Sequence, residues 1–420
     1  MNLLCDGANI MGFYQKTKQS IVLVMVATIA IGFFWGLYFQ APGVVKAIFS
    51  ALMILSAFVF PYGYIRSNDF DKISNAILRI ILALSVFSIL RSVFNEDADM
   101  YAFGNKWTTL FGNEYCALLL LPPLFTYLAT EPANILYAER INYQYMLIGA
   151  FFIFLFKFPL ATIVLVLPVF VPYVKRSYKL LIGVAVLHTV LGATLGPNPT
   201  RANILYLLFA VAAFFLVFVV RKKAVTKIFC ISCVVLSFFF FVPLLYSNNH
   251  NEPSFFEKAQ TYVIGKTENK DLATDTRTFL YREMALDLTK TDSWIWGKGA
   301  FAHYYSLWFD EGANGRFGRI GSEVPFLNFL MHGGIVYVFF YFLLFLYAIY
   351  KGLWKSNNKF VQCIAVVVTG WFFCSFVCDL TGARYYHVLF FMLLGCCLSE
   401  RFLNMNDDEI AMLFYEGEKI

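Results

Sequence analysis

The chain alternates long apolar runs with short polar segments over nearly all of its length. Many of these runs reach the roughly 18–20 residues that a helix needs to cross the hydrocarbon core of a membrane. A transmembrane β-barrel would instead show segments of about ten residues with alternating polarity. The pattern therefore predicts an all-α, polytopic integral membrane protein.

The pattern predicts about twelve transmembrane helices. They fall near residues 20–39, 45–64, 75–94, 109–128, two short ones within 145–174, and then 180–195, 202–220, 228–246, 324–350, 361–380 and 386–398. The region 145–174 is long for one helix, and Pro159 in its middle favours two. Two spans also place the basic segment 175–179 in the cytoplasm, after an earlier polar loop that contains Arg140.

The lysines and arginines predict the orientation of these spans. Short segments assigned to the cytoplasm hold most of the cations, such as those at 221–223, whereas the short outer turns hold few. Both chain ends are then cytoplasmic. The chain divides into a membrane region at 1–246, a large periplasmic loop at 247–322, and a membrane region with a cytoplasmic tail at 323–420.

Composition agrees with this class, because 60% of the residues are hydrophobic and 14% are charged. A soluble domain is usually about half apolar and a quarter charged. The net charge of +6 follows from topology-setting cations, and no nucleic-acid module is visible. Cys230 and Cys233 form a CxxC, but inside an apolar run with no partner pair, which favours buried small hydrophobes over a metal or redox site. No nucleotide loop or zinc signature is visible, so we expect no metal and no cofactor.

The long polar segment Thr274–Gly334 gathers the candidate chemistry between two apolar spans. A Thr-Asp-Thr sequence precedes a helical pattern in which Leu280, Met284 and Leu288 recur at a spacing of four. This predicts a helix to about Lys290, lying along the membrane surface. A polar segment rich in arginine and aromatic residues, held against a membrane, suits a substrate that is part lipid, part phosphate and part sugar.

Three arginines are candidate phosphate ligands. Arg277 lies in the first turn of the predicted helix, where a cation is unfavourable unless an anion binds there. Arg201 lies just outside span 202–220 and reaches the same face, so the two guanidinium groups would clamp a diphosphate. The alternative for Arg201 is a snorkelling, topology-setting cation. Arg282, one turn further on, is either a surface ion-pair partner or a third ligand.

Trp294 and Trp296 are either ordinary interfacial aromatics or sugar-stacking rings. Glu323 opens span 324–350, where an acid is either a helix cap or a general base. His303 and His332 are rival bases. His332 is the deeper of the two, and a buried ionisable group within a span is a functional candidate.

A series of short motifs adds to this interpretation. They are Phe111-Gly112-Asn113, Thr200-Arg201, Thr276-Arg277 with Tyr281-Arg282-Glu283, Trp296-Gly297-Lys298-Gly299, and Ser322-Glu323 followed by Gly334-Ile335-Val336. In this order and topology the chain resembles the O-antigen ligase/polymerase superfamily, specifically the Wzy-type polysaccharide polymerases. Ligases of the superfamily carry a His near the position of Glu323, so the glutamate here favours a polymerase.

The resemblance implies a GT-C-like, metal-independent glycosyltransferase in the bacterial inner membrane. It would join undecaprenyl-diphosphate-linked repeat units into an O-antigen, a capsule or an exopolysaccharide, alongside a flippase and a chain-length regulator. By the same resemblance, Arg201 and Arg277 hold the diphosphate and Glu323 deprotonates the attacking hydroxyl. The alternatives are a ligase acting on lipid A core and a transporter, although a transporter would place its ionisable groups at mid-membrane.

Overall fold

A computed structural model describes residues 69–94, 119, 123–152, 164–194, 201–246, 276–304, 321–378 and 385–417. Within these ranges the chain is mostly helical and forms no strand. Three of the described helices are long and apolar enough to cross a membrane, namely Lys72–Phe94, Lys223–Leu245 and Pro325–Lys355. The described part of the chain is therefore helical, and its long apolar helices agree with an all-α membrane protein, whereas the full set of twelve spans stays a prediction.

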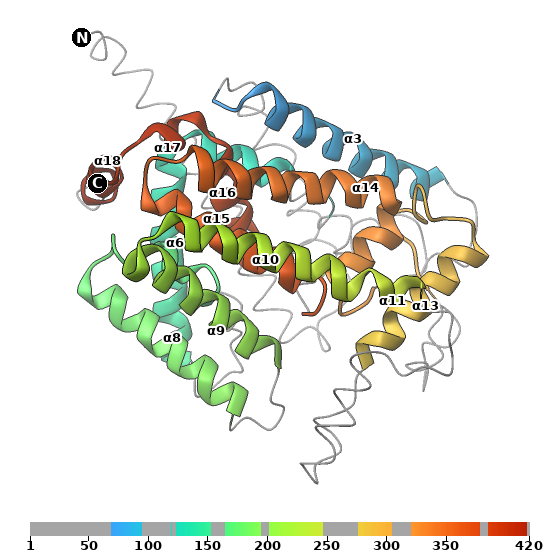
Figure 1. The fold of residues 1–420 in the computed structure, drawn as a ribbon, viewed down its shortest axis with the longest axis horizontal. Helices are drawn as coiled ribbons and strands as arrows, with labels where there is room; N and C mark the ends of the chain where they lie inside the picture. Colours follow the sequence, from blue (N-terminus) through green and yellow to red (C-terminus); the bar gives the residue numbers. More distant parts are fainter. Residues whose placement is uncertain are drawn as a thin grey trace.

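The elements are labelled in Figure 1. The helices in chain order are α3 (Lys72–Phe94), α6 (Pro132–Phe152), α8 (Arg176–Thr194), α9 (Arg201–Phe214), α10 (Lys223–Phe241), α11 (Pro243–Tyr246), α13 (Thr276–Lys290), α14 (Pro325–Tyr350), α15 (Lys359–Cys374), α16 (Tyr385–Leu398), α17 (Glu400–Asn404) and α18 (Asp407–Gly417). Between them lie the 3₁₀ segments η3 (Tyr127–Thr130) and η4 (Leu167–Val169) and the π-helical segments η5 (Phe215–Val220) and η7 (Lys351–Lys355).

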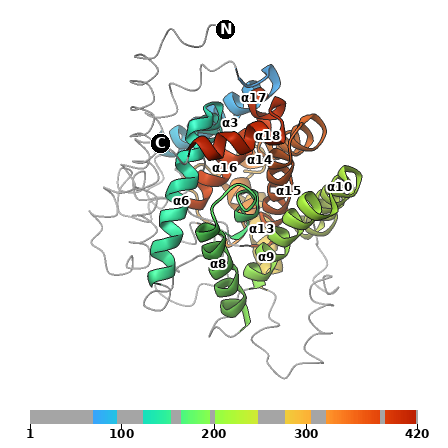
Figure 2. The same cartoon turned by 90° about the vertical axis from the view of Figure 1, so that its left-hand side faces the viewer.

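The centre of the bundle is formed by α14, α15 and α16. Helix α14 lies against α3 on one side and α15 on the other, and α15 also contacts α9, α10 and α16. Figure 2 shows α6 and α8 on one flank and α10 on the opposite flank. The rings of Phe342, Phe372 and Phe376 meet in this core at centroid distances of 4.9–5.5 Å. The centre is therefore an aromatic core.

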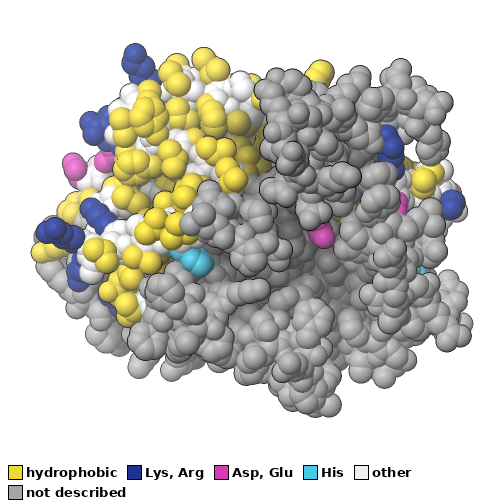
Figure 3. All heavy atoms as spheres, turned by 90° about the horizontal axis from the view of Figure 1, so that it is seen from below, with side chains coloured by type: hydrophobic (Ala, Val, Ile, Leu, Met, Phe, Trp, Pro, Cys, Tyr) yellow, Lys and Arg dark blue, Asp and Glu magenta, His cyan; other side chains and the backbone are white. Residues whose placement is uncertain are grey.

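The outer helices turn apolar side chains away from this core. On α10, Ile228 is 65% exposed and Phe239 is 71% exposed. Figure 3 shows described hydrophobic side chains gathered over one part of the surface, with lysine and arginine at its edge. A broad exposed apolar surface marks contact with a membrane or a partner. Here it accompanies spanning helices, so lipid is the natural surrounding.

Two of the expected boundaries differ from those in the structure. A polar loop containing Arg140 was expected, but Arg140 lies within α6, which begins at Pro132. Pro132 fits the first turn of a helix because that position needs no backbone donor. The second span of region 145–174 was expected to reach Val174, but after the helical Val164 the chain forms the buried 3₁₀ turn η4. Residues 153–163 lie outside the described residues.

Helix α14 is broken, although the sequence predicts one continuous span. Gly334 has φ 72° and ψ −175°, a backbone conformation that only glycine adopts readily. The first half, Pro325–Gly333, therefore ends inside the span and a second half begins at Ile335. Such breaks occur at membrane depth only where other groups satisfy the freed backbone.

The end of α14 is fixed by a buried ammonium group. Lys351 Nζ lies 3.0 Å from Oδ2 of Asp71 and 2.7 Å from Oε1 of Glu400. It also donates a hydrogen bond to the Leu398 carbonyl. Burial alone would raise the pKa of Asp71, but hydrogen bonds led by those from Ser74 and Tyr347 lower it to about 2. We call the Lys351, Asp71 and Glu400 cluster the Lys351 junction, which ties α3 to the C-terminal helices.

Candidate functional site

The predicted helix of the polar segment is present as α13, which begins at Thr276 and ends at Lys290. Its apolar residues Leu280, Met284 and Leu288 are fully buried. They pack inside the protein against α11 and α14, so protein covers this face of the helix, and its place along the membrane surface stays a prediction. The spacing of four predicted the face correctly, because it selects one side of a helix whatever covers it.

The start of α13 lies beside the start of α14. The Tyr281 hydroxyl donates to the Phe376 carbonyl over 2.8 Å, and the Tyr281 ring lies 6.0 Å from that of Phe326. Arg282 follows Tyr281 directly, and Glu323 lies three residues before Phe326. The structure thus brings the segments that carry two of the candidate residues into contact.

A turn formed by residues 294–299 docks into the break in α14, and we call it the Trp294–Gly299 turn. The Ile335 N–H donates to the Trp294 carbonyl over 2.8 Å, and the Val336 N–H donates to the Ile295 carbonyl over 3.3 Å. In return, the Lys298 and Gly299 N–H groups donate to the carbonyls of Met331 and His332. The turn therefore satisfies the backbone groups that the break releases.

The C-terminal part of α3 also packs against the break in α14 and against the Trp294–Gly299 turn. The Ser88 hydroxyl donates to the His332 carbonyl over 2.8 Å. Arg91 Nη1 donates to the Gly297 carbonyl over 2.7 Å, and the Ser92 hydroxyl accepts from the Phe301 N–H. Three segments far apart in sequence meet here, which explains why local patterns did not reveal Ser88 and Arg91.

A largely buried ion pair joins the turn to α13. Lys298 Nζ lies 2.8 Å from Asp287 Oδ2, with side-chain exposures of 11% and 16%. Lys298 also donates to the His303 carbonyl over 2.6 Å. Sequence reasoning did not single out this pair. The available signal was Lys298 between two glycines, a place where a charged side chain needs a partner if the backbone packs closely.

His332 lies at the end of the first half of α14, directly before the break. It is buried, and its Nδ1 lies 3.0 Å from the Gly299 carbonyl. Because a carbonyl can only accept, Nδ1 carries the proton in this contact. The polar turn thus reaches a histidine that a continuous helix would place deep in the membrane.

Glu323 stands at the opposite end of that half-helix, next to a hydrogen-bonded clamp. The Ser322 N–H donates to Asn328 Oδ1 over 2.6 Å, and Asn328 Nδ2 donates back to the Ser322 carbonyl over 2.9 Å. Val324 is the N-cap of α14 and Pro325 its first residue, so Glu323 precedes the cap. The half-buried Glu323 is held beside the positive end of the half-helix.

The tryptophans take different positions. Trp294 is half-buried and its Nε1 donates to the Thr289 hydroxyl over 3.1 Å. Trp296 is 49% exposed and meets Phe87 edge-on at 5.8 Å. Of the two, Trp296 has the accessible face that stacking on a sugar requires.

The arginines are only partly placed. Arg282 is half-buried on α13. Arg201 opens α9 and Arg277 is the second residue of α13, but their side chains lie outside the described part. The diphosphate clamp therefore stays a prediction. His303 is half-buried, and its carbonyl is held by Lys298.

The cysteines in the described part are all free, and six of these seven are buried. Within the same ranges, no group of three His, Cys, Asp or Glu side chains is placed to hold a metal ion. In the CxxC of α10, Cys230 is buried and Cys233 is half-buried, and both are free thiols. No family model, curated protein or solved structure matches the chain.

Proposed function

We propose that the protein is a metal-independent polysaccharide polymerase that acts on lipid-diphosphate-linked sugars at the outer face of the membrane. The observation that supports this most is the docking of the polar Trp294–Gly299 turn into the break of α14. It gathers an exposed tryptophan and a buried ion pair at one end of an apolar bundle. Such a site adjoins both the lipid and the water that the substrate occupies.

The proposed reaction transfers a growing glycan from its lipid diphosphate to a new lipid-linked repeat unit. The acceptor hydroxyl attacks the anomeric carbon, a new C–O bond forms, and the bond to the diphosphate breaks. The lipid diphosphate leaves with the electron pair. Arg201 and Arg277 stabilise the charge on this leaving group, since guanidinium groups match phosphate oxygens.

Glu323 takes the proton of the attacking hydroxyl in this scheme. A sugar hydroxyl is a weak nucleophile, so a positioned base accelerates its attack. The Ser322–Asn328 clamp beside Glu323 supports this role because it fixes the backbone that carries the carboxylate. His303 is the alternative base, and Lys298 fixes its backbone in a comparable way.

The test compares Glu323→Gln with a matched control in a strain that lacks the wild-type gene. The glutamine is nearly isosteric but cannot accept the proton, so polymer formation should fall by about 10²–10⁴-fold. The control is Asp292→Asn, an exposed acid of the same polar segment whose left-handed backbone also suits asparagine. Polymer length is measured on a gel of surface polysaccharide.

The pattern on the gel separates the alternatives. A single repeat unit on the acceptor, with normal membrane levels of the variant protein, supports polymerisation. An unmodified acceptor points to a ligase instead. Full-length polymer from Glu323→Gln, together with its loss in His303→Ala, would assign the base to His303.

A further inference from the structure

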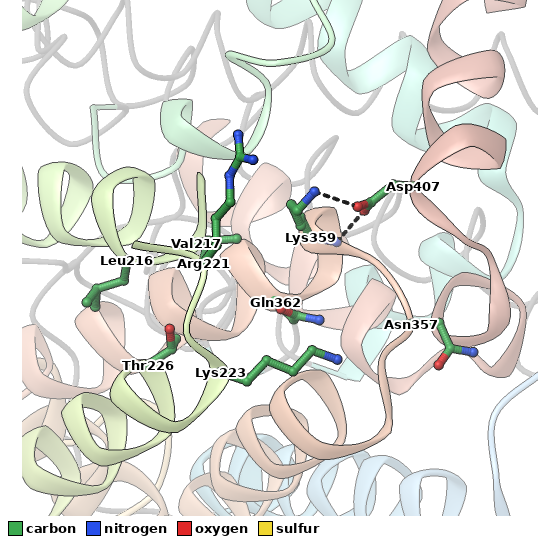
Figure 4. Close-up of a pocket in the computed structure, with 9 residues that line it drawn as sticks. All are labelled: Leu216, Val217, Arg221, Lys223, Thr226, Asn357, Lys359, Gln362 and Asp407. Carbon is green, nitrogen blue, oxygen red and sulfur yellow. Dashed lines mark hydrogen bonds and ion pairs between the residues drawn. The ribbon is translucent and has the colours of Figure 1, made fainter. Parts of the chain in front are cut away.

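A second polar site lies at the opposite end of α14 from the Trp294–Gly299 turn. A cavity of about 130 Å³ opens between η5, α10, α15 and the start of α18. We call it the basic pocket (Figure 4), and its lining residues are Leu216, Val217, Arg221, Lys223, Thr226, Asn357, Lys359, Gln362 and Asp407. A single buried water needs only about 10–15 Å³ on the same scale, so the pocket has room for a larger group.

Charge in the basic pocket is unbalanced. Three cations and one carboxylate line it. The carboxylate of Asp407 forms an ion pair with Lys359, whose Nζ lies 2.9 Å from Oδ2. The backbone N–H of Lys359 also donates to Asp407 Oδ1 over 2.7 Å. Within the described part of the chain, neither Arg221 nor Lys223 forms an ion pair, so two positive charges remain for a ligand.

Arg221 is held by its own backbone. It has φ 56° and ψ 16°, a left-handed conformation that usually favours glycine after a helix. Its N–H donates to the Leu216 carbonyl and its Nε donates to the Phe218 carbonyl over 2.8 Å. These contacts hold the Nε end of the guanidinium group, and Figure 4 shows the group directed to another part of the pocket than the Lys223 amine and the Gln362 amide.

Further donors complete the lining. Figure 4 shows the Lys223 amine and the Gln362 amide directed toward the same part of the pocket. Thr226 also lines the pocket, and its hydroxyl donates to the Lys222 carbonyl. Ammonium, guanidinium and amide donors around one cavity form a set that binds phosphate oxygens.

The basic pocket lies at the membrane surface. One apolar span begins at Lys223, and another ends at Lys355, shortly before Lys359. Lys227 Nζ stacks over the ring of the exposed Trp354 at 4.7 Å. Lysines and tryptophans of this kind gather at the level of lipid headgroups.

We infer that the basic pocket binds a phosphate group at the membrane surface, presented either as a phosphomonoester headgroup or as free phosphate. A phosphomonoester carries about −1.5 to −2 charges at neutral pH, which matches the two uncompensated cations. Leu216 and Val217 supply an apolar wall for the start of an acyl chain. The phosphate can come from the headgroup of phosphatidic acid or from free phosphate, and both present the same chemistry. The inference is independent of the proposed polymerase function.

The test is a titration of the full-length protein in detergent with short-chain phosphatidic acid, short-chain phosphatidylcholine or inorganic phosphate. The change in melting temperature gives an apparent Kd for each. Lys223→Ala should raise the Kd for the bound phosphate by about tenfold or more, as expected for loss of a charge-assisted contact. Arg221→Gly should do the same without lowering the melting temperature of the unliganded protein, since glycine suits the left-handed backbone.

Lys222→Ala is the matched control, because Lys222 is an exposed neighbour outside the lining. The Kd of Lys222→Ala for the bound phosphate should equal that of the wild type. Binding of phosphatidic acid alone identifies a lipid headgroup, and binding of inorganic phosphate identifies free phosphate as sufficient. The inference is overturned if neither binds, if Arg221→Gly and Lys223→Ala bind like the wild type, or if Lys222→Ala loses as much affinity.

Discussion

Replacement of Gly334 by alanine should disrupt the candidate site from within. Gly334 breaks α14 with φ 72°, and a Cβ there would lie under 3.0 Å from backbone atoms of Ile295 and Gly297. Backbone atoms cannot rotate away as a flexible side chain can. The Trp294–Gly299 turn must therefore leave the break, or Gly334 must return to a helical conformation that closes it.

The size of the effect follows from the contacts that are lost. An alanine held in this region of φ and ψ costs about 1–3 kcal/mol. Withdrawal of the turn leaves the Ile335 and Val336 N–H groups without their acceptors, at about 1–3 kcal/mol each. The total of about 3–9 kcal/mol is comparable with the 5–15 kcal/mol that stabilises a typical protein.

The assay is size-exclusion chromatography of a fluorescent fusion protein after heating in detergent. Gly183→Ala on α8 is the control, because no atom lies within 4 Å of its added Cβ. It should melt at or above the wild-type temperature, since alanine favours a helix by about 1 kcal/mol over glycine. If Gly334→Ala melts together with Gly183→Ala and still makes polymer, the turn does not hold the break and this reasoning fails.

Four further outcomes are expected. Lys351→Met leaves two carboxylates of the Lys351 junction without their ammonium group, so the protein should lose about 3–5 kcal/mol, seen as a lower melting temperature. Because the pKa of Asp71 is lowered from 3.8 to about 2, its stabilising effect is complete above pH 3.8 and lost as the pH falls toward 2. Asp71→Asn should flatten that part of a curve of melting temperature against pH. Lys298→Met should destabilise by a similar 3–5 kcal/mol through the unpaired Asp287, and an unchanged melting temperature would show that the pair contributes nothing. Arg277→Ala should stop chain growth while the protein still inserts, and Arg277→Lys should restore little, because a lysine lacks the bidentate fork; normal polymer from both would remove Arg277 from the mechanism.

Sequence periodicity predicted best those helices whose boundaries depend on the apolar spacing within the helix and on the residues that flank it. The start and end of α13 and the extent of α16 follow from apolar spacing and from the residues that flank it. The span predicted at 75–94 matches α3 to within three residues. In these segments the residues close in sequence are enough to predict where the helix begins and ends.

The break at Gly334 could not be predicted in this way. A glycine in an apolar run is compatible with a continuous helix, and its conformation here depends on a turn about 40 residues earlier. The same holds for Lys298, whose partner Asp287 is on another element. Arg140 was assigned to a loop because a charge and several polar residues interrupt the apolar pattern, yet α6 carries them on a half-buried surface.

Helix α3 is one of the first described segments to be synthesised, yet its main partners are made last. The hydrogen bond from Ser88 can form only after His332 is synthesised, 244 residues later. The ion pair of Asp71 likewise requires Lys351, 280 residues later. Asp69 accepts from Ser399, which follows 330 residues later. At about 5–20 residues per second, translation separates these partners by roughly 15–60 s. During that interval the serines on α3 that later become buried must be shielded by lipid headgroups, water or the insertion machinery, so the last third of the chain completes the assembly of the first.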